Sequence, residues 1–517
     1  MKTFECKFRQ GPVVLVSREI AFTFPLSYAY LAGYLREMGE EVHIVFRNSD
    51  RKTLVKQIMD LNPVLVGFGS LYPELQEIGD IITSLDKVGR KFPVVIGGQM
   101  VSPIPEFAVS VTGTDFGIVG EGEIILHQLV TALREGKDVY GVNGVVIRHG
   151  NETISTSPGK YIKDLSKLPA IPYDLFPQDQ WLPIGRWYAA NCPQPHWRFE
   201  DRVINVHGGR GCPFRCNFCY HHSKPRYRSI PKMIAEGAEA LDRFNGNMLY
   251  FSDDLVLASP KRAQELVGAI GSLKKPIEYS VSARFDILAQ MDDELLYAMK
   301  ATGCRIMGLG IESGSNRILR IVGKNCTSEM ILNGLERLKK VGILPTVSIM
   351  VGQYTETKED VEDSIELMRK SVRSNPNIQY AFTITTPFPG SQLYKLIFQK
   401  GYLRNHKDFY NIYFSTSKEW QQVVNLSAMS AEEVVKMYRK INKVYLQEKF
   451  NALGLKVPMI GNLQIALGKT AAVINNKILC KLSNDDASSR IPKAYHFFRD
   501  STLHKLDRCR LRLEGFQ

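Results

Sequence analysis

The sequence lacks any apolar run of about 18 residues, which is the length that a membrane-spanning helix needs. Its beginning lacks the order of basic, apolar and small residues that marks a secretory signal. No segment repeats with a period of about 20 to 50 residues, and no tract has low complexity. These absences argue against a membrane-spanning, a secreted and a repeat protein. We therefore expect a cytoplasmic protein, in which thiols stay reduced.

Cysteine is also scarce outside one short segment. Nine cysteines occur among 517 residues. Three of them lie in GCPFRCNFCY (211–220), and the other six are scattered along the chain: Cys6, Cys192, Cys304, Cys326, Cys480 and Cys509. Because disulfides are rare in a reducing compartment, this distribution favours one metal site together with ordinary buried thiols.

The composition is that of an ordinary folded protein with a basic surplus. Hydrophobic residues make up 44% and charged residues 23%, which is close to the usage of soluble domains. At about 150 residues per domain, a chain of this length suggests three domains. The net charge is +13, and residues 451–517 carry eleven Lys and Arg against five Asp and Glu. Such a basic surface attracts acidic partners such as phosphates and lipid headgroups.

Residues 1–140 alternate short apolar runs with amphipathic stretches. The runs predict buried strands at 12–17, 41–46, 63–69, 93–98 and 115–120, with helices between them such as 26–39 and 74–89. Strands that alternate with helix-length patterns indicate βαβ units, so we expect an α/β domain with a doubly wound, Rossmann-like parallel sheet. Residues 141–200 begin with a hairpin pattern and continue as a linker rich in Pro and Trp.

A second series of βα units occupies residues 201–400. Six strands are expected at 204–211, 248–253, 277–283, 304–312, 344–352 and 380–390, with helices between them such as 260–273, 292–302, 328–341 and 358–372. Six units at this spacing predict a partial (βα)6 barrel whose site lies at the carboxyl ends of its strands. Residues 401–517 have a helical, aromatic and basic pattern, and we expect a helical C-terminal region there.

The strongest chemical signal is the spacing Cys-x3-Cys-x2-Cys of Cys212, Cys216 and Cys219. Three thiolates so close in sequence can bind three irons of one cubane cluster. No fourth cysteine lies nearby, so the fourth iron is left open to a small molecule. The alternatives are buried thiols and a structural zinc site, for which His221 or His222 would have to supply the fourth ligand.

Residues 204–390 resemble the radical S-adenosylmethionine (SAM) superfamily. The resemblance implies that the three cysteines ligate a [4Fe–4S] cluster and that Phe218 lies near the adenine of SAM. YFSDD (250–254) stands at the motif that contacts the SAM amino group, which implies this role for Ser252, Asp253 and Asp254. SVSARFD (280–286) resembles the ribose motif, with Ser282 and Arg284, and GLGIESGS (308–315) resembles the fifth-strand stretch, with Glu312 facing cofactor or barrel. MVGQYTET (350–357) departs from the sixth-strand motif.

Each motif outside the cysteines also has a structural interpretation. Asp253 and Asp254 could cap a helix that begins near Ser259, and Arg284 could form a salt bridge at the barrel rim. Glu312 could be a carboxylate at the start of a helix, stabilised by free backbone N–H groups.

The order of the domains resembles that of cobalamin-dependent radical SAM enzymes, over residues 10–440. GFGSLYP (67–73), with Ser70 and Leu71, is similar to the loop near the corrin nucleotide tail. IGGQMVSPIPE (96–106) supplies Gly97 and Gly98, and VGEGE (119–123) supplies Glu121. The resemblance implies that these residues bind cobalamin. Residues 17–33 contain no histidine, so the Asp-x-His-x-x-Gly signature of a cobalt-ligating histidine is absent; the alternative is a sheet domain without cofactor.

The resemblance implies a C-methyltransferase that acts on an unactivated carbon of a small-molecule or lipid substrate through a 5′-deoxyadenosyl radical. One alternative is an oxidative cyclase of the magnesium-protoporphyrin ester type or another non-methylating enzyme. A methylthiotransferase or RNA-modifying enzyme is disfavoured because methylthiotransferases carry a second set of three cysteines in the N-terminal domain, where this chain has only Cys6.

The partners expected from this interpretation are a small-molecule or lipid substrate and an electron donor such as flavodoxin or ferredoxin, and no nucleic acid. Residues 458–482 are apolar with spaced lysines, and a basic aromatic sequence follows. Such a tail can lie on an anionic membrane surface, so peripheral membrane association is one expectation. The alternative is a C-terminal helix packed on the barrel.

Overall fold

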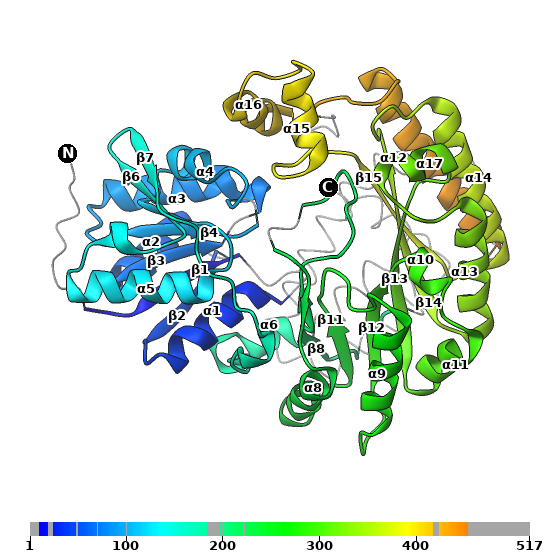
Figure 1. Ribbon diagram of the computed structural model, residues 1–517, viewed down its shortest axis with the longest axis horizontal. Helices are drawn as coiled ribbons and strands as arrows, with labels where there is room; N and C mark the ends of the chain where they lie inside the picture. Colours follow the sequence, from blue (N-terminus) through cyan, green and yellow to red (C-terminus); the bar gives the residue numbers. More distant parts are fainter. Residues whose placement is uncertain are drawn as a thin grey trace.

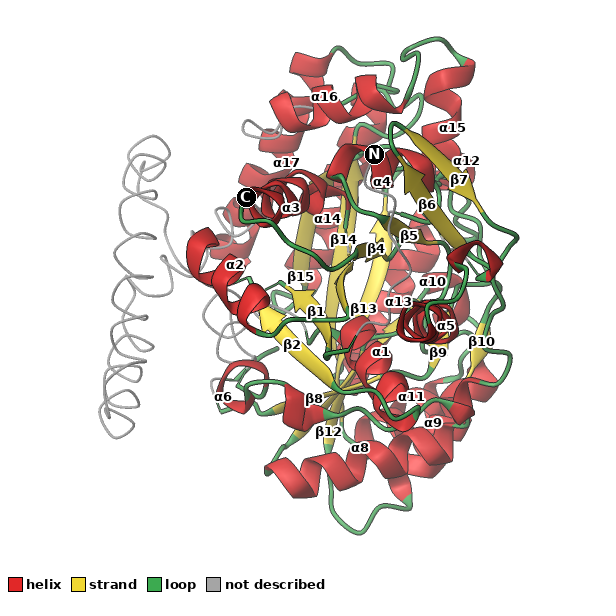
Figure 2. Ribbon diagram, turned by 90° about the vertical axis from the view of Figure 1, so that its left-hand side faces the viewer, coloured by secondary structure: helices red, strands yellow, loops and turns green. Residues whose placement is uncertain are grey.

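The computed structural model describes residues 10–18, 24–47, 50–69, 71–99, 101–183, 196–198, 200–220, 223–416 and 423–452. In these residues two α/β domains lie side by side, with the N-terminal domain on the left of Figure 1 and the barrel on the right. Figure 2 shows the structure turned by 90°, with helices around most strands and with β6 (Val145–His149), β7 (Glu152–Ser155) and β10 (Arg226–Tyr227) at the edge.

The N-terminal domain is built on a seven-stranded sheet in the order β2-β1-β3-β4-β5-β6-β7. Its first five strands are parallel: β1 (Val13–Ser17), β2 (Val42–Phe46), β3 (Leu65–Gly69), β4 (Val94–Gly97) and β5 (Phe116–Ile118). All five residues of β1 are buried, as expected of a parallel strand that is covered on both faces.

Alternate residues of β1 separate the two faces of this sheet. Val13 and Leu15 belong to one apolar cluster, to which α1 (Leu26–Glu37) and α5 (Gly122–Glu135) also contribute. Val14 and Val16 belong to a second cluster, which contains side chains of three other helices: α2 (Arg51–Asp60), α3 (Leu75–Lys87) and α4 (Pro105–Thr112). Because successive side chains of a strand point to opposite faces, helices cover both faces, and the doubly wound prediction is confirmed.

The N-terminal sheet continues beyond residue 140. The predicted hairpin is formed by β6 (Val145–His149) and β7 (Glu152–Ser155), and β6 pairs antiparallel with β5. The hairpin therefore extends the sheet by two strands and belongs to it, rather than to the linker in which the sequence placed it.

The second domain contains six parallel strands in the order β8-β11-β12-β13-β14-β15, as predicted. They are β8 (Val203–Val206), β11 (Met248–Phe251), β12 (Glu278–Ala283), β13 (Cys304–Glu312), β14 (Leu344–Val351) and β15 (Gln379–Ile384). The helices between them are α8 (Ile230–Phe244), α9 (Pro260–Gly271), α10 (Phe285–Leu288), α11 (Asp293–Ala301), α12 (Asn316–Val322), α13 (Ser328–Val341) and α14 (Lys358–Ser374).

The long helices of the barrel begin at side chains that cap them. A serine, threonine or aspartate accepts a hydrogen bond from a backbone N–H of the first turn at each start: Ser229, Ser259, Asp292, Thr327 and Thr357. These polar side chains satisfy N–H groups that have no partner within the helix, and they fix where each helix starts.

The C-terminal helices join the two domains. α15 (Gln392–Gln399) and α16 (His406–Thr416) pack on the N-terminal domain, where the ring of Tyr72 contacts those of Phe409 and Tyr413. α17 (Ala431–Ala452) packs against α14 and β15 (Figure 1). Among the described residues, no helix has the length and apolar character to cross a membrane. The apolar and basic tail lies outside the described residues.

Candidate functional site

The three clustered cysteines follow the first barrel strand. Their loop is enclosed by a short antiparallel ribbon of β9 (Gly209–Arg210) and β10 (Arg226–Tyr227). Cys212 and Cys216 are partly buried and Cys219 is exposed. All three line one cavity of about 840 Å³. The loop therefore presents its thiols to a common space at the carboxyl end of the barrel.

The cysteine loop is held by the last turn of α12 and by the glycine that follows it. The backbone N–H of Asn217 donates to the carbonyl of Val322 (3.1 Å), and its side-chain amide donates to the carbonyl of Ile321 (3.0 Å). Gly323 has a positive φ of 81°, and a Cβ on it would lie 3.6 Å from the Cα of Cys216. A glycine is suited to this position because the chain turns there against the cysteine loop.

A zinc ion is the alternative to the predicted cluster at the three cysteines. Within the described part of the chain, no three His, Cys, Asp or Glu side chains meet closely enough to hold one metal ion. A zinc site needs its ligands to converge on one point, whereas each cysteine of a cubane binds a different iron. His221 and His222, on which the zinc alternative depended, lie outside the described residues.

Arg284, the residue predicted to contact the ribose, lies beside the cysteine loop. It is buried at the end of β12, and its Nη1 donates to the Sγ of Cys216 at 3.3 Å. Its Nε and Nη2 each donate to Asp286 at 2.9 Å, and its guanidinium lies 3.7 Å from the ring centroid of Phe214. Burial disfavours its charge, but Asp286 and Cys216 outweigh burial and raise the pKa of Arg284. It is both the predicted rim salt bridge and a contact of the cysteine loop.

The acidic pair after β11 holds the start of the cysteine loop. Both carboxylate oxygens of Asp253 accept from the N–H of Gly208, at 2.9 and 3.0 Å, and Asp254 accepts from the N–H of Gly211 at 3.0 Å. Burial raises the pKa of Asp253 to about 7 despite these donors. Ser259 caps α9 itself, so the helix-cap interpretation of the acidic pair is wrong.

The other predicted SAM residues have partners within the protein. The Ser252 hydroxyl donates to Asn205 (3.0 Å), and the Ser282 hydroxyl accepts from the N–H of Val256 (3.4 Å). Phe218 is partly buried and packs against the second apolar cluster, which joins the N-terminal domain to α15 and α16. All three therefore lie at the carboxyl ends of strands or in the cysteine loop, where the motif predicted them.

Glu312 is buried in an ion pair, which its sequence motif did not reveal. Its Oε1 lies 3.0 Å from the Nζ of Lys324, and its Oε2 accepts from the Ser348 hydroxyl at 3.2 Å. It has a positive φ of 66°, a strained conformation for a residue other than glycine. A Cβ on Gly310 would lie 2.1 Å from Glu312 Oε1, so only a glycine leaves room for this ion pair. The interpretation of Glu312 as a helix-start carboxylate is therefore wrong.

A second cavity, of about 450 Å³, lies between the two domains. The N-terminal domain lines it with glycines in its parallel strands and in the segments that follow them: Gly67, Gly69, Gly97, Gly98, Gly120 and Gly122. The barrel lines it with His207, Arg210 and Asp254 among others. Open α/β sheets bind ligands outside the carboxyl ends of their strands, so this cavity is the candidate cobalamin site.

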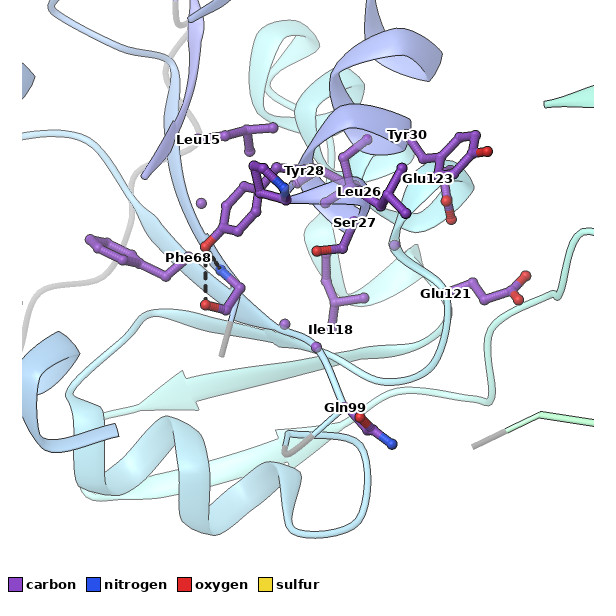
Figure 3. A pocket seen from close by; sticks show the side chains of 18 of the residues that line it. Leu15, Leu26, Ser27, Tyr28, Tyr30, Phe68, Gln99, Ile118, Glu121 and Glu123 are labelled. Atoms are coloured by element: carbon purple, nitrogen blue, oxygen red, sulfur yellow. Dashed lines mark hydrogen bonds between the residues drawn. The ribbon is translucent and has the colours of Figure 1, made fainter. Parts of the chain in front are cut away.

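Gly97 leaves space for a ligand in this cavity. A Cβ on Gly97 would meet only Ile118, at 3.8 Å, so this glycine keeps the space beside it open. Tyr28 also lines the cavity and joins the adjacent strands β1 and β3. Its hydroxyl lies 2.8 Å from the carbonyl oxygen of Val16 and accepts a hydrogen bond from the N–H of Gly69 at 2.6 Å. Figure 3 shows the two hydrogen bonds between the Tyr28 hydroxyl and the backbone of Gly69 as dashed lines, with Ile118 between Tyr28 and Gln99 in this view.

The predicted cobalamin residues differ in their placement. Gly97, Gly98 and the exposed Leu71 line the cavity, and Ser70 lies outside the described residues. Glu121 also lines the cavity, but its carboxylate is directed to the barrel. It accepts from Arg226 Nη1 at 3.1 Å and lies 3.3 Å from Arg210 Nη1.

The arginines of this ion-pair network were missed from the sequence. Arg210 and Arg226 are cross-strand partners in the ribbon that encloses the cysteine loop. Glu123 adds a second carboxylate, 2.5 Å from Arg210. Glu121 and Arg226 are 105 residues apart in the chain, so no local sequence pattern signals their contact.

Family comparisons match both domains. Residues 14–130 match the B12 binding domain, and residues 206–368 match the radical SAM superfamily. An uncharacterised methyltransferase of Pyrococcus horikoshii is 27% identical over 427 residues, covering 80% of this chain and 86% of that protein. The anaerobic magnesium-protoporphyrin IX monomethyl ester cyclase of Rubrivivax gelatinosus is 25% identical over 453 residues, covering 84% and 76%.

Solved structures share the fold. The radical SAM methyltransferase TsrM of Kitasatospora setae, with cobalamin and a [4Fe–4S] cluster bound, superposes with a TM-score of 0.60 at 20% identity, covering 76% of this chain and 75% of that one. The cobalamin-dependent SAM radical enzyme OxsB, with aqua-cobalamin and SAM bound, gives a TM-score of 0.58 at 16% identity, covering 87% and 63%.

Proposed function

From the premise that this chain is a radical SAM enzyme with an N-terminal B12-binding domain, we propose that it is a C-methyltransferase that acts on an unactivated carbon of a small-molecule or lipid substrate. Its cofactors are a [4Fe–4S] cluster, SAM and cobalamin, as the sequence predicted. The observation that carries the proposal is the interdomain cavity, in which Gly97 and Gly98 of the N-terminal sheet share one space with Asp254 of the barrel.

The proposal assigns the cofactors to residues of this chain. Cys212, Cys216 and Cys219 would hold the cluster, Asp253 and Asp254 the amino group of SAM, and the glycine-lined end of the N-terminal sheet the corrin. When bound, the cluster would supply the electron that cleaves SAM, SAM the 5′-deoxyadenosyl radical, and SAM and cobalamin the methyl group. The carboxyl ends of β8 and β11 would then lie between the two cofactors.

The residues of the chain bind and orient rather than react. Acidic side chains favour an ammonium group by charge-assisted hydrogen bonds, so the pair after β11 suits the amino group of SAM. The Glu121–Arg210–Arg226 network holds the cobalamin loop against the ribbon of the cysteine loop. A closed boundary excludes water, which protects a reactive radical from side reactions.

A non-methylating oxidative cyclase is the second candidate. It is favoured by a specific observation: the magnesium-protoporphyrin ester cyclase of Rubrivivax gelatinosus is 25% identical to this chain over 453 residues, against 27% over 427 residues for the Pyrococcus methyltransferase. Both candidates use the same cofactors, and they differ in whether a methyl group leaves SAM.

The products of SAM distinguish the two. The protein is purified without oxygen, reconstituted with iron, sulfide and hydroxocobalamin, reduced with titanium(III) citrate and given SAM. A methyltransferase forms S-adenosylhomocysteine in addition to 5′-deoxyadenosine. Cys216→Ala should lose 5′-deoxyadenosine, because the reductive cleavage of SAM needs the electron of the cluster. 5′-Deoxyadenosine without S-adenosylhomocysteine would support the cyclase instead.

Radical SAM enzymes take an electron from a reductant, and we infer a flavodoxin or a ferredoxin as the donor here. Peripheral membrane association through the basic tail stays a prediction, because residues 453–517 lie outside the described part of the chain.

A further inference from the structure

The guanidinium of Arg284 is fixed on three sides by other residues of the protein. Its Nε and Nη2 donate hydrogen bonds to the carboxylate of Asp286, and its Nη1 donates to the Sγ of Cys216. The ring of Phe214 covers one face of the guanidinium. The side chains of Arg284 and Asp286 are 7% and 9% exposed. A buried, planar group with these contacts has little freedom to turn away from Cys216.

This arrangement places a fixed positive charge next to one cluster ligand. The reduction potential of an iron–sulfur cluster depends on net charge, on hydrogen bonds to its sulfurs and on solvent exposure. A reduced cluster carries one more negative charge than an oxidised one, so a nearby cation stabilises the reduced form more. Because Arg284 is buried, salt screens this interaction only weakly.

The negative charge of Asp286 acts on the reduction potential in the opposite direction to the charge of Arg284. It holds the edge of the guanidinium formed by Nε and Nη2, whereas Nη1 faces Cys216. Its negative charge therefore offsets part of the field of Arg284 at the cluster. Removing the carboxylate leaves the arginine charge in place and uncompensated, whereas removing the arginine leaves an uncompensated carboxylate.

We propose that the Arg284–Asp286 pair sets the reduction potential of the cluster held by Cys216, with Arg284 raising it and Asp286 limiting that rise. Arg284 is thus a residue that places a fixed positive charge beside the cluster. The proposal requires that the cluster binds, and it does not depend on whether a methyl group is transferred.

A potentiometric titration followed by the electron paramagnetic resonance (EPR) signal of the reduced cluster tests this. It is done on the anaerobically reconstituted full chain without SAM, so that contacts with SAM do not contribute. Arg284→Gln should shift the midpoint potential to more negative values. Arg284→Lys, which keeps the positive charge but loses the planar guanidinium with its several N–H donors, should shift the potential less. Asp286→Asn should shift it to more positive values.

Lys275→Gln is the control, because it removes one positive charge just before β12, at the amino ends of the strands, where Lys275 pairs with Asp242. It should leave the potential unchanged. The proposal is overturned if Arg284→Gln and Asp286→Asn shift the potential in the same direction, or if neither shifts it beyond the control. If Arg284→Gln fails to assemble a cluster, Asp286→Asn decides: a positive shift supports the proposal, and no shift or a negative one contradicts it.

Discussion

Glu121 of the N-terminal domain accepts hydrogen bonds from Arg226 of the barrel, across the boundary between the two cofactor domains. Its neighbours Gly120 and Gly122 line the interdomain cavity, and Arg226 belongs to the ribbon that encloses the cysteine loop. Arg210, the cross-strand partner of Arg226, is also within ion-pair distance of Glu121. One carboxylate thus pairs with two adjacent arginines and links the candidate sites of two cofactors.

The first prediction is that Glu121→Gln weakens this boundary. It leaves two partly buried arginines with one fewer counter-charge, and breaking an ion pair whose carboxylate is buried costs about 3 kcal/mol or more. We expect a fall of about that size in the free energy of unfolding, measured by denaturant titration.

The matched control for Glu121→Gln is Glu77→Gln. Glu77 also pairs with a buried arginine, Arg47, but its side chain is 50% exposed. Pairs with an exposed partner contribute at most about 1 kcal/mol. Equal losses of stability in the two variants would show that the Glu121 network does not hold the domains together.

The second prediction concerns the cluster. Cys212→Ala, Cys216→Ala and Cys219→Ala should each lower the iron and sulfide content, because two thiolates are too few to hold a cubane that has one open iron. Cys304→Ala should retain both, since Cys304 is buried in the barrel core. Iron analysis and the EPR spectrum of the reduced protein provide the readout. A Cys216→Ala protein with full iron content would refute the assignment.

The third prediction concerns the interdomain cavity. Gly97→Leu should abolish retention of cobalamin, because its side chain would occupy the space that Gly97 leaves open. Gly97→Ala should fold normally, since its Cβ would meet only Ile118 at 3.8 Å. The corrin absorbance after gel filtration measures retention, and the cluster content shows that the barrel is intact. Full corrin retention by Gly97→Leu would place cobalamin elsewhere.

The fourth prediction follows from the raised pKa of Asp253, about 7, which burial causes. An unfolded aspartate has a pKa of about 3.9, so between these values the folded state binds more protons. Stability from this group is present below the unfolded pKa and is lost as pH rises, by up to about 1.4 kcal/mol per unit. The stability of Asp253→Asn relative to the wild type should therefore increase from pH 5 to pH 7. A constant difference between the two unfolding curves would mean that Asp253 is ionised throughout.

The fold could be predicted largely from the sequence because its strands are apolar runs with amphipathic stretches between them. VVLVS of β1 is buried along its whole length, which only a strand covered on both faces explains. The hairpin of β6 and β7 was predicted, but its place in the sheet was not. That place depends on the pairing of Phe116 with Ile147, residues distant in sequence.

The partners of the site residues could not be predicted, because tertiary packing decides them. The motifs placed Arg284 and Glu312 at strand ends, where the structure has them. Their contacts, Cys216 for Arg284 and Lys324 for Glu312, come from other segments of the chain. The family and the cofactors were predicted correctly from the cysteine spacing and the domain order. The roles assigned to the individual SAM and cobalamin residues stay predictions.

The central claim, that a methyl group passes from SAM through the interdomain cavity, is tested most directly by label transfer. The reconstituted, reduced protein is incubated with methyl-deuterated SAM in the dark. The cobalamin is then extracted, and its mass is measured by mass spectrometry. We predict that the extracted cobalamin carries the deuterated methyl group, and that Gly97→Leu yields no labelled corrin. Unlabelled cobalamin, recovered in full from a protein that still forms 5′-deoxyadenosine, would contradict the account.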